Sequence, residues 1–448
     1  MAYTPHTEDE RRSMLEAVGI RSLDDLYQAI PADVRFPDLE LPDPVSELEI
    51  MQELQALSEA NLDARHTACF LGAGAYNHFV PSVVDHMLRR GEFYTAYTPY
   101  QPEISQGTLQ AIFEYQSLIC NLTGMDVSNA SHYDGATALA EAAILATNHH
   151  RGKRTKIVLS PGIHPHYRQT VRTYMQGMGL QLAGDTAVGN DSAALAGLLD
   201  GNTLMVAVQY PDFFGRIEDF AALGKAAHAV GALLCVCVNP LALGLLKPPS
   251  EFEADVVVGD GQPLGIPMSF GGPSLGHFTV KKDFVRKMAG RLVGETVDSQ
   301  GRRGFVLTLS TREQHIKREK ATSNICTNVA LMALASAVYL SAMGKQGLRR
   351  VAELCYHKAH YAAKEIGALK GYALWNRGEF FHEFVVRCPK PVADINRFLL
   401  DEINTLGGYD LGQDYPELKD HMLLAVTEMN SKEQIDDLVA GLKEVAHG

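Results

Sequence analysis

Two short stretches in the middle of the chain are apolar at almost every position. Residues 233–238 read Leu-Leu-Cys-Val-Cys-Val, and residues 255–259 read Asp-Val-Val-Val-Gly. A strand with one face in water alternates apolar and polar residues, so a run without alternation predicts a strand buried on both faces. Such a strand needs a covering layer on each side, and helices supply both layers in α/β proteins. The two stretches therefore predict a sheet between two layers of helices.

The same pattern continues on both sides of these strands. Between residues 70 and 310, apolar runs of strand length alternate with longer segments that have helical spacing. We expect strands at residues 156–160 and 203–209, and helices at residues 105–122, 135–148 and 166–178 and from Asp219 onward. Residues 70–328 are therefore predicted to form a large three-layer α/β domain with a mainly parallel sheet.

The two ends of the chain predict different structures. Residues 1–69 hold two capping-box spacings, Thr7…Glu10 and Ser46…Glu49, separated by a stretch that contains four prolines. We expect a helical arm here, because the segment lacks the residues for a core of its own. Residues 329–448 predict a smaller α+β domain with helices and strands in separate groups. Its expected helices are residues 329–343, 347–369, 392–400 and one after Ser431, and its expected strands are residues 372–375, 383–387 and 423–426.

Charge and composition exclude several classes of protein. The formal net charge is −13, and basic residues cluster only in residues 312–320, so nucleic-acid binding is not expected. The longest apolar segment, residues 329–343, is shorter than the roughly 20 residues that cross a bilayer. Seven cysteines without a CxxC pair and an N-terminus without a signal-peptide core predict a cytoplasmic protein with reduced thiols. His164 and His166 lack further ligands nearby, so no metal site is expected.

The most distinctive segment is residues 94–107, which contains three tyrosines and two prolines and cannot form a regular element. Prolines stiffen such a loop, and stiff loops with polar aromatic side chains often line binding sites. An ordered surface turn is the alternative. The candidate binding residues of this loop are Tyr94, Tyr97, Thr98, Tyr100, Gln101 and Gln106.

Two further segments each allow two interpretations. Residues 129–137 form a polar loop that enters a helix, where exposed N–H groups favour an anion. Asp134 is placed to cap that helix and could supply the negative charge itself. Residues 311–324 read either as a solvated helix followed by a polar cap or as a basic, hydroxyl-rich edge that binds a phosphate or a partner.

These segments, taken together, resemble the motifs of the glycine cleavage system P-protein family. The matching segments follow the family's order across nearly the whole chain and comprise residues 70–78, 97–103, 129–131, 311–316 and 320–327. The resemblance implies the fold-type-I architecture of pyridoxal-phosphate enzymes. Family members occur as one long chain or as separate α and β subunits, and a chain of 448 residues that matches the N-terminal half resembles the α subunit.

The resemblance can be checked at the residues that would hold the cofactor. In this fold a carboxylate after a central strand pairs with the pyridinium nitrogen, and a lysine roughly two dozen residues later forms the Schiff base. Asn239 stands at the expected carboxylate position and Gln262 at the expected lysine position, and no lysine occurs between Lys247 and Lys281. We therefore expect no catalytic residue in this chain. The resemblance implies that a lysine-bearing β subunit binds pyridoxal phosphate covalently.

The resemblance also implies partners and roles. It implies an α2β2 heterotetramer that decarboxylates glycine and transfers the aminomethyl group to the lipoyl arm of H-protein. Thr322, Ser323 and Asn324 would contact the cofactor phosphate of the partner subunit. Tyr94, Tyr97, Thr98 and Tyr100 would line the pocket for glycine and the lipoyl arm, with Gln101 and Gln106 orienting them. A self-sufficient pyridoxal-phosphate enzyme is disfavoured by the missing lysine, and a non-catalytic scaffold or regulator is the alternative function.

Overall fold

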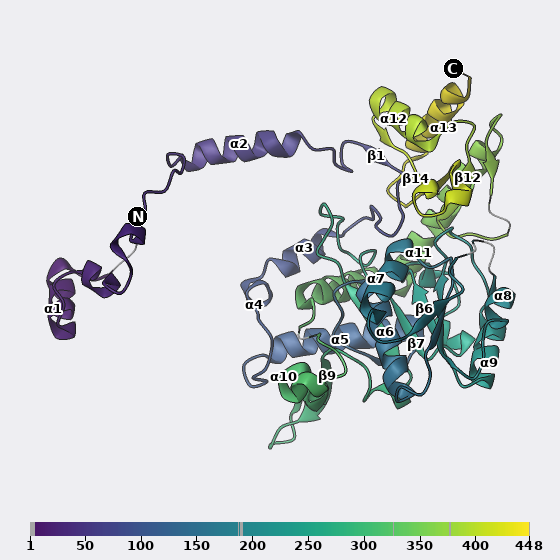
Figure 1. Ribbon diagram of the computed structural model, residues 1–448. Coiled ribbons are helices and arrows are strands. Elements are labelled where there is room, and N and C mark those ends of the chain that lie inside the picture. The colour runs from purple at the N-terminus through teal and green to yellow at the C-terminus, as the bar shows by residue number, and fades with distance from the viewer. Residues whose placement is uncertain (1–4, 187, 189–190, 326, 376–377, 448) are drawn as a thin grey trace. The chain divides into compact units, whose positions relative to one another are not determined.

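A computed structural model describes residues 5–186, 188, 191–325, 327–375 and 378–447 (Figure 1). Cys326 of the residue 320–327 motif and the first four residues lie outside these ranges. The chain divides into two compact units, residues 1–62 and residues 63–448. The boundaries expected at residues 69 and 328 stay predictions. No helix among the described residues is long and apolar enough to cross a membrane.

The first unit consists of short helices. α1 (Glu8–Val18) and α2 (Glu47–Glu59) each begin with the predicted capping box, in which Thr7 and Ser46 exchange hydrogen bonds with Glu10 and Glu49. Short 3₁₀ segments at Leu23–Tyr27 and Ala32–Val34 lie between them. No described residue of these elements is buried, so within this unit the helices build no core.

The second unit is built on a central sheet. Within the described residues this sheet has seven strands in the order β2-β8-β7-β6-β5-β3-β4. β4, β3, β5, β6 and β7 run parallel, whereas β8 is antiparallel to β7 and to β2. The predicted mainly parallel sheet is therefore confirmed. The strands are β2 (Val127–Ser128), β3 (Lys156–Leu159), β4 (Gln181–Ala183), β5 (Thr203–Tyr210), β6 (Leu233–Val238), β7 (Val256–Asp260) and β8 (Gly276–Val280).

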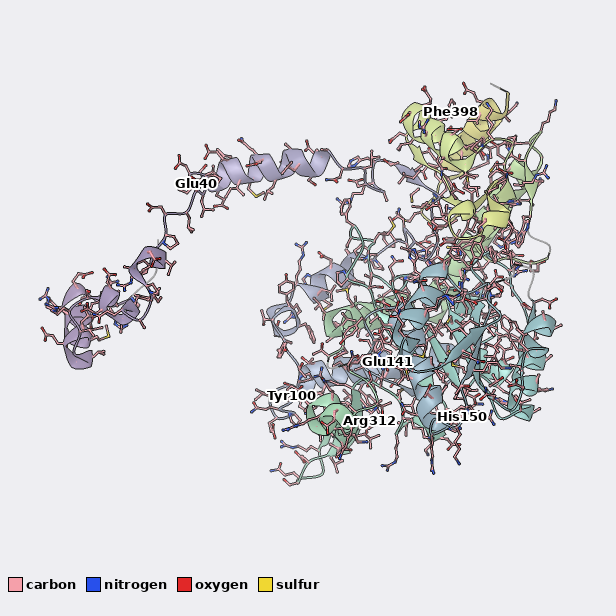
Figure 2. All side chains as sticks on the ribbon, in the orientation of Figure 1. Glu40, Tyr100, Glu141, His150, Arg312 and Phe398 are labelled. Carbon is pink, nitrogen blue, oxygen red and sulfur yellow. The ribbon has the colours of Figure 1, made fainter. Side chains whose placement is uncertain are left out.

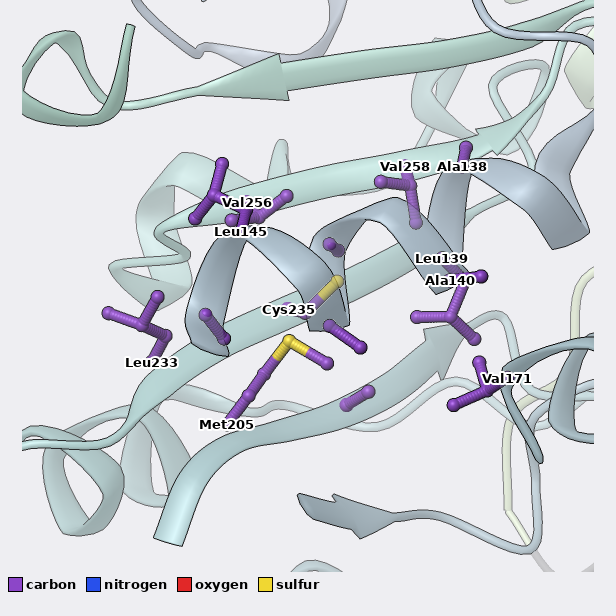
Figure 3. Close-up of a cluster of buried hydrophobic side chains, with 14 of the residues drawn as sticks. Ala138, Leu139, Ala140, Leu145, Val171, Met205, Leu233, Cys235, Val256 and Val258 are labelled. Atoms are coloured by element: carbon purple, nitrogen blue, oxygen red, sulfur yellow. The ribbon is translucent and has the colours of Figure 1, made fainter. Parts of the chain in front are cut away.

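Alternate residues of the central strands point into different helix layers. In β6, Cys235 and Cys237 pack with α6 (Gly135–His149) and α7 (Pro165–Met175), as Figure 3 shows in part. Leu234 and Val236 pack on the other face, with α8 (Ser192–Ala196) and α9 (Ala221–Ala229). Both faces of the strand are therefore buried, which explains its unbroken apolar sequence.

A long helical segment follows the central sheet. α11 spans Ala330–Gly367, and the backbone leaves helical geometry at Gly344, where φ is 58°. This break separates the two helices expected at residues 329–343 and 347–369. The helix as far as Cys355 packs with α5 (Gln106–Thr123) and the residues after the central strands, and from Ala359 onward it packs with the C-terminal elements.

The C-terminal elements form a second sheet. Within the described residues it has four strands in the order β11-β12-β15-β14, all antiparallel. One face packs against α11, α12 and α13, and the other packs against aromatic residues of the loop after β5. The elements are β11 (Ala373–Leu374), β12 (Glu383–Arg387), α12 (Val392–Ile403), β14 (Tyr409–Asp410), β15 (His421–Ala425) and α13 (Lys432–His447).

Several elements are not anticipated from the sequence. β9 (Leu292–Val297) and β10 (Arg303–Thr308) form an antiparallel hairpin. β1 (Ala68–Cys69) pairs in parallel with β13 (Thr405–Leu406), far away in the sequence. The remaining short helices are α3 (Ser82–Leu88), α4 (Gly91–Tyr94) and α10 (Gln314–Lys317).

Candidate functional site

The carboxyl ends of β5, β6 and β7 surround a small cavity. Ligands of α/β sheets bind at such strand ends, in pockets of about 300–1,000 Å³. The cavity here has a volume of about 40 Å³. It is lined by Gly74, Tyr76, His164, Tyr167, Gln209, Phe213, Cys237, Val238, Asn239, Asp260 and Pro263. None of these described residues is a lysine.

Asn239 and Gln262 lie where the sequence places them, at the ends of β6 and β7. The side-chain oxygen of Asn239 accepts a hydrogen bond from the backbone N–H of Leu241 at 3.0 Å. The Gln262 side chain is buried and bonds to the main chain of Tyr76 through both its amide oxygen and its amide nitrogen, each at 2.9 Å. Gln262 therefore fastens the segment around Tyr76 to the end of β7.

Two carboxylates occupy the N-terminus of α6. Asp134 accepts a hydrogen bond from the backbone N–H of Thr137 at 2.7 Å, and Asp260 accepts one from the N–H of Gly135 at 3.2 Å. Ser274 donates its hydroxyl to Asp260 at 2.6 Å. Burial raises the pKa of Asp260. The helix cap is thus made by this chain's own side chains, which favours the capping interpretation of residues 129–137 over a phosphate site.

These residues do not fit a bound pyridoxal phosphate. The cavity is far smaller than a cofactor pocket, no described lining residue offers an amine, and the helix N-terminus that would bind a phosphate is already capped. A phosphate there would also face the carboxylates of Asp134 and Asp260, and like charges at such distances repel.

The tyrosine loop presents its side chains to solvent. The exposed fractions are 67% for Tyr94, 84% for Tyr97 and 50% for Tyr100. Tyr94 and Tyr97 border a narrow cleft of about 60 Å³ together with the first turn of α11 and part of α5. Thr98 is half-buried and Gln101 is exposed. Large exposed aromatic side chains gathered on one loop are typical of a surface that binds a ligand or partner.

Tyr100 is held by a buried arginine. Arg291 is 2% exposed, donates to the Tyr100 hydroxyl at 2.8 Å and lies 5.2 Å from the centre of the Tyr100 ring. Its guanidinium also lies 3.6 Å from the carboxylate of Glu313. The sequence gives no sign of this contact, because 191 residues separate Arg291 from Tyr100. The buried Arg291 side chain therefore fixes the position of the tyrosine loop.

Gln106 holds the other end of the loop. Its amide nitrogen donates to the carbonyl oxygens of Pro102 at 2.7 Å and Phe305 at 2.9 Å, and its amide oxygen accepts from the N–H of Phe305 at 2.9 Å. The predicted orienting role of Gln106 stays a prediction, but these contacts tie the loop to β10. Among the described residues, the Gln101 side chain has no hydrogen-bond partner.

Thr322, Ser323 and Asn324 border a separate hollow of about 480 Å³. The hollow is also lined by Ile144, Tyr174, Gln314, Arg318, Glu319 and Ala321. Ser323 donates its hydroxyl to the carboxylate of Glu141 at 2.8 Å. The segment from Thr311 onward forms helical turns of three or four residues instead of one solvated helix. The hydroxyl groups of Thr322 and Ser323 therefore line the same hollow as Arg318.

The structure does not bring the tyrosine loop and the hydroxyl segment into one cavity. Among the described residues, no lining residue of the cleft beside Tyr97 also lines the hollow beside Ser323. The chain between the two surfaces contacts residues 129–131, since Asn328 donates to the carbonyl of Ala130 and the Ser131 hydroxyl accepts from the N–H of Val329. Figure 2 labels Tyr100, Glu141 and Arg312 in this part of the chain.

The buried carboxyl group of Glu141 is expected to make the stability of the fold depend on pH. Burial raises the pKa of its carboxyl from 4.5 to about 7, although the Ser323 hydroxyl lowers it. The folded chain therefore binds more protons than the unfolded chain between these values, and stability falls as pH rises through them. Glu141→Gln, which cannot ionise, is expected to stabilise the chain by up to about 3 kcal/mol near pH 8, and less near pH 5. Urea unfolding at both pH values measures this, and an equal effect at both would contradict it.

His78, Cys355 and Glu428 form another polar cluster, with ligand atoms within 4.8 Å of one another. Glu428 accepts hydrogen bonds from His78 at 2.8 Å and from the Cys355 thiol at 3.2 Å. Burial raises the pKa of Cys355. Metal ions bind the thiolate, whereas this cysteine is a hydrogen-bond donor. The three side chains therefore form a buried hydrogen-bonded cluster.

Comparison with known proteins gives matches over the full length of the chain. A family model described as glycine cleavage system P-protein matches residues 1–442. A protein of Thermomicrobium roseum named probable glycine dehydrogenase (decarboxylating) subunit 1 is 56% identical over 447 residues, which is 99% of each chain. A protein of Anoxybacillus flavithermus with the same name is 52% identical over 98% of each chain.

Solved structures are similar over comparable lengths. A crystal structure of glycine decarboxylase (P-protein) of the glycine cleavage system in inhibitor-bound form has a TM-score of 0.89 and 44% identity, and the match covers 99% of this chain and 100% of that one. A cysteine desulfurase of Escherichia coli has a TM-score of 0.63 at 14% identity, covering 88% of this chain and 98% of that one, and shares the fold alone. These likenesses confirm the predicted α/β, fold-type-I class.

Proposed function

The chain belongs to the glycine cleavage system P-protein family, and we propose that it is the α subunit, subunit 1, of glycine dehydrogenase (decarboxylating). A partner subunit completes the enzyme. In this proposal the partner bears the lysine and binds pyridoxal phosphate covalently, and the two subunits form an α2β2 heterotetramer. The assembled enzyme removes the carboxyl group of glycine as CO2 and transfers the aminomethyl group to the lipoyl arm of H-protein.

The buried Gln262 side chain after β7 is the observation that carries this proposal. Gln262 occupies the position expected for the lysine and uses its side chain to bind the backbone of Tyr76. An internal hydrogen bond of this kind cannot replace an amine that reacts with an aldehyde. In this proposal, a chain with the fold of the enzyme but without the Schiff-base lysine contributes surface residues to the active site of the partner subunit.

Two surfaces of the chain are available for that role. We assign the hollow with Arg318, Thr322, Ser323 and Asn324 to the phosphate of the partner's cofactor, because a guanidinium and neighbouring hydroxyl groups suit a phosphate. We assign the tyrosine loop to the wall of the pocket for glycine and the lipoyl arm. Its aromatic side chains are exposed in this chain and can therefore be covered on assembly.

The proposal is tested by reconstitution. The purified chain is expected to show no exchange of the glycine carboxyl group with bicarbonate, and addition of a lysine-bearing partner is expected to produce it in the presence of H-protein. The partner without this chain provides the control. If the partner alone exchanged at the full rate, the chain would be a scaffold and the proposed role would be wrong.

Ser323 provides a sharper test within the assembled enzyme. In this chain the Ser323 hydroxyl donates to Glu141, and in the proposal it turns to the partner's cofactor phosphate on assembly. Ser323→Ala removes that hydroxyl and is expected to weaken cofactor retention about tenfold, because a hydrogen bond to a charged group contributes about 1.5 kcal/mol or more. Ser323→Thr keeps the hydroxyl and should retain most of the affinity. Cofactor release on dilution measures both variants. Equal retention by the alanine variant and the wild type would contradict the assignment.

A further inference from the structure

The C-terminal sheet carries a cavity that the proposed function does not use. Its volume is about 450 Å³, within the usual range for small-molecule sites. It is lined by Arg216, Ala373, Leu374, Trp375, Arg387 and His421. None of these described residues is an aspartate or glutamate, although the whole chain has a net charge of −13.

Strand register explains why these residues meet. Ala373 of β11 lies opposite Arg387 of β12, and Arg387 lies opposite His421 of β15. Directly opposed residues of antiparallel strands point to the same face of a sheet. Farther along the same face, Val385 and Leu423 are buried under Phe213 and Phe214.

The cavity therefore begins where the apolar covering of this face ends. The small Ala373 leaves space beside the longer side chains of Arg387 and His421. On this face, each of the two strands has a buried apolar residue at one position and a charged or polar cavity residue two positions away. An aromatic ring, Trp375, and an arginine from a distant loop, Arg216, border this end of the face, which is more than a solvated sheet face requires.

Trp375 and Arg216 complete the wall. Arg216, from the loop after β5, lies 5.5 Å from the centre of the Phe214 ring and 5.6 Å from that of Trp375. Its guanidinium pairs with Asp212 at 2.7 Å, which fixes its orientation. A guanidinium held in this way is preorganised, and little side-chain entropy is lost when it binds an anion.

Arg387 and His421 are the two remaining polar groups of the wall. Arg387 is exposed at the end of β12. The Nδ1 atom of His421 is buried and has no hydrogen-bond partner among the described residues. Burial is the main cause that lowers the pKa of His421, which favours the uncharged form of its imidazole. The wall thus combines two guanidinium groups, an imidazole and an indole ring.

We propose that this cavity binds a small planar anion, whose ring lies against Trp375 and whose carboxylate or phosphate pairs with Arg387 and Arg216. Guanidinium groups pair with both kinds of anion, and an indole ring stacks on a planar group. Nucleoside monophosphates and aromatic carboxylates share this chemistry. The site is independent of the proposed catalytic role, because its residues belong to a different cavity from those of the tyrosine loop and the hydroxyl segment.

Trp375 is the only tryptophan in the sequence, so its fluorescence reports this site directly. The full-length chain is titrated with AMP, benzoate, adenosine and inorganic phosphate, with excitation at wavelengths that the adenine ring does not absorb. AMP, benzoate or both should change the emission in a saturable way, and adenosine and inorganic phosphate should bind at least about tenfold more weakly. A response to only one of the two planar anions identifies the source.

Variants separate this site from general charge effects. Arg387→Gln is expected to weaken binding about tenfold or more. Arg397→Gln removes an exposed arginine of α12 and is expected to leave binding unchanged. The proposal is overturned if none of the probes gives a saturable change, if adenosine or inorganic phosphate binds as tightly as the planar anions, or if the two variants weaken binding equally.

Discussion

Replacing Tyr97 by alanine is expected to lower glycine decarboxylation by the assembled enzyme about tenfold or more, because truncation of a central aromatic side chain at a binding surface typically costs about 2 kcal/mol. Tyr97 is 84% exposed, and substitutions at exposed positions usually change stability by less than about 0.5 kcal/mol. The variant should therefore fold and assemble as the wild type does. Decarboxylation and the unfolding midpoint are measured on the same preparation.

Met178 provides a control for Tyr97. It is a large apolar residue, 42% exposed, that follows α7 and belongs to neither candidate surface. Met178→Ala is expected to leave the reaction unchanged. If Tyr97→Ala were as active as Met178→Ala, the tyrosine loop would be an ordered surface turn and its assignment to the pocket would be wrong.

Replacing Gly215 by alanine is expected to destabilise the chain by about 3 kcal/mol or more. Gly215 has a φ of 86°, a conformation that costs other residues about 1–2 kcal/mol. A Cβ there would also overlap the backbone carbonyl of Glu383, and overpacking against backbone adds about 1–3 kcal/mol. This close approach joins the loop after β5, which carries Phe213 and Arg216, to β12.

Gly152 is the matched control, since its φ is 68° and no described atom lies within 4 Å of the Cβ position. Gly152→Ala bears only the conformational cost of about 1 kcal/mol. Thermal unfolding of the two variants compares them directly. Equal shifts in Tm would mean that the backbone contact with Glu383 contributes nothing.

Unbroken apolar runs in the sequence predicted the central sheet, because its strands are covered by helices on both faces. The apolar residues of β6 divide between two helix layers, so the sequence has no alternation and the interpretation as a buried strand is confirmed. β9 and β10 were not predicted. Their hairpin extends from buried Leu292 to exposed Val297 and has Gly294 and Gly304 within it, a composition that indicates loop as readily as strand.

Long-range contacts explain what the sequence could not show about the site. The sequence indicated Asn239 and Gln262 through their distance from predicted strands, and the structure places both at strand ends. Arg291, Glu141 and Asp260 were not assigned roles, since each has a partner more than a hundred residues away in the sequence. No local pattern marks such residues, because an isolated Arg or Glu is usually a solvated surface residue.

Visible absorption shows whether this chain can anchor the cofactor by itself. Pyridoxal phosphate is added to the purified chain, and the Schiff-base band is sought before and after addition of a lysine-bearing partner. We expect the band to appear only with the partner, and borohydride to fix the cofactor to the partner alone. A borohydride-reducible band in this chain by itself would show that another lysine serves as the anchor, and the account would be wrong.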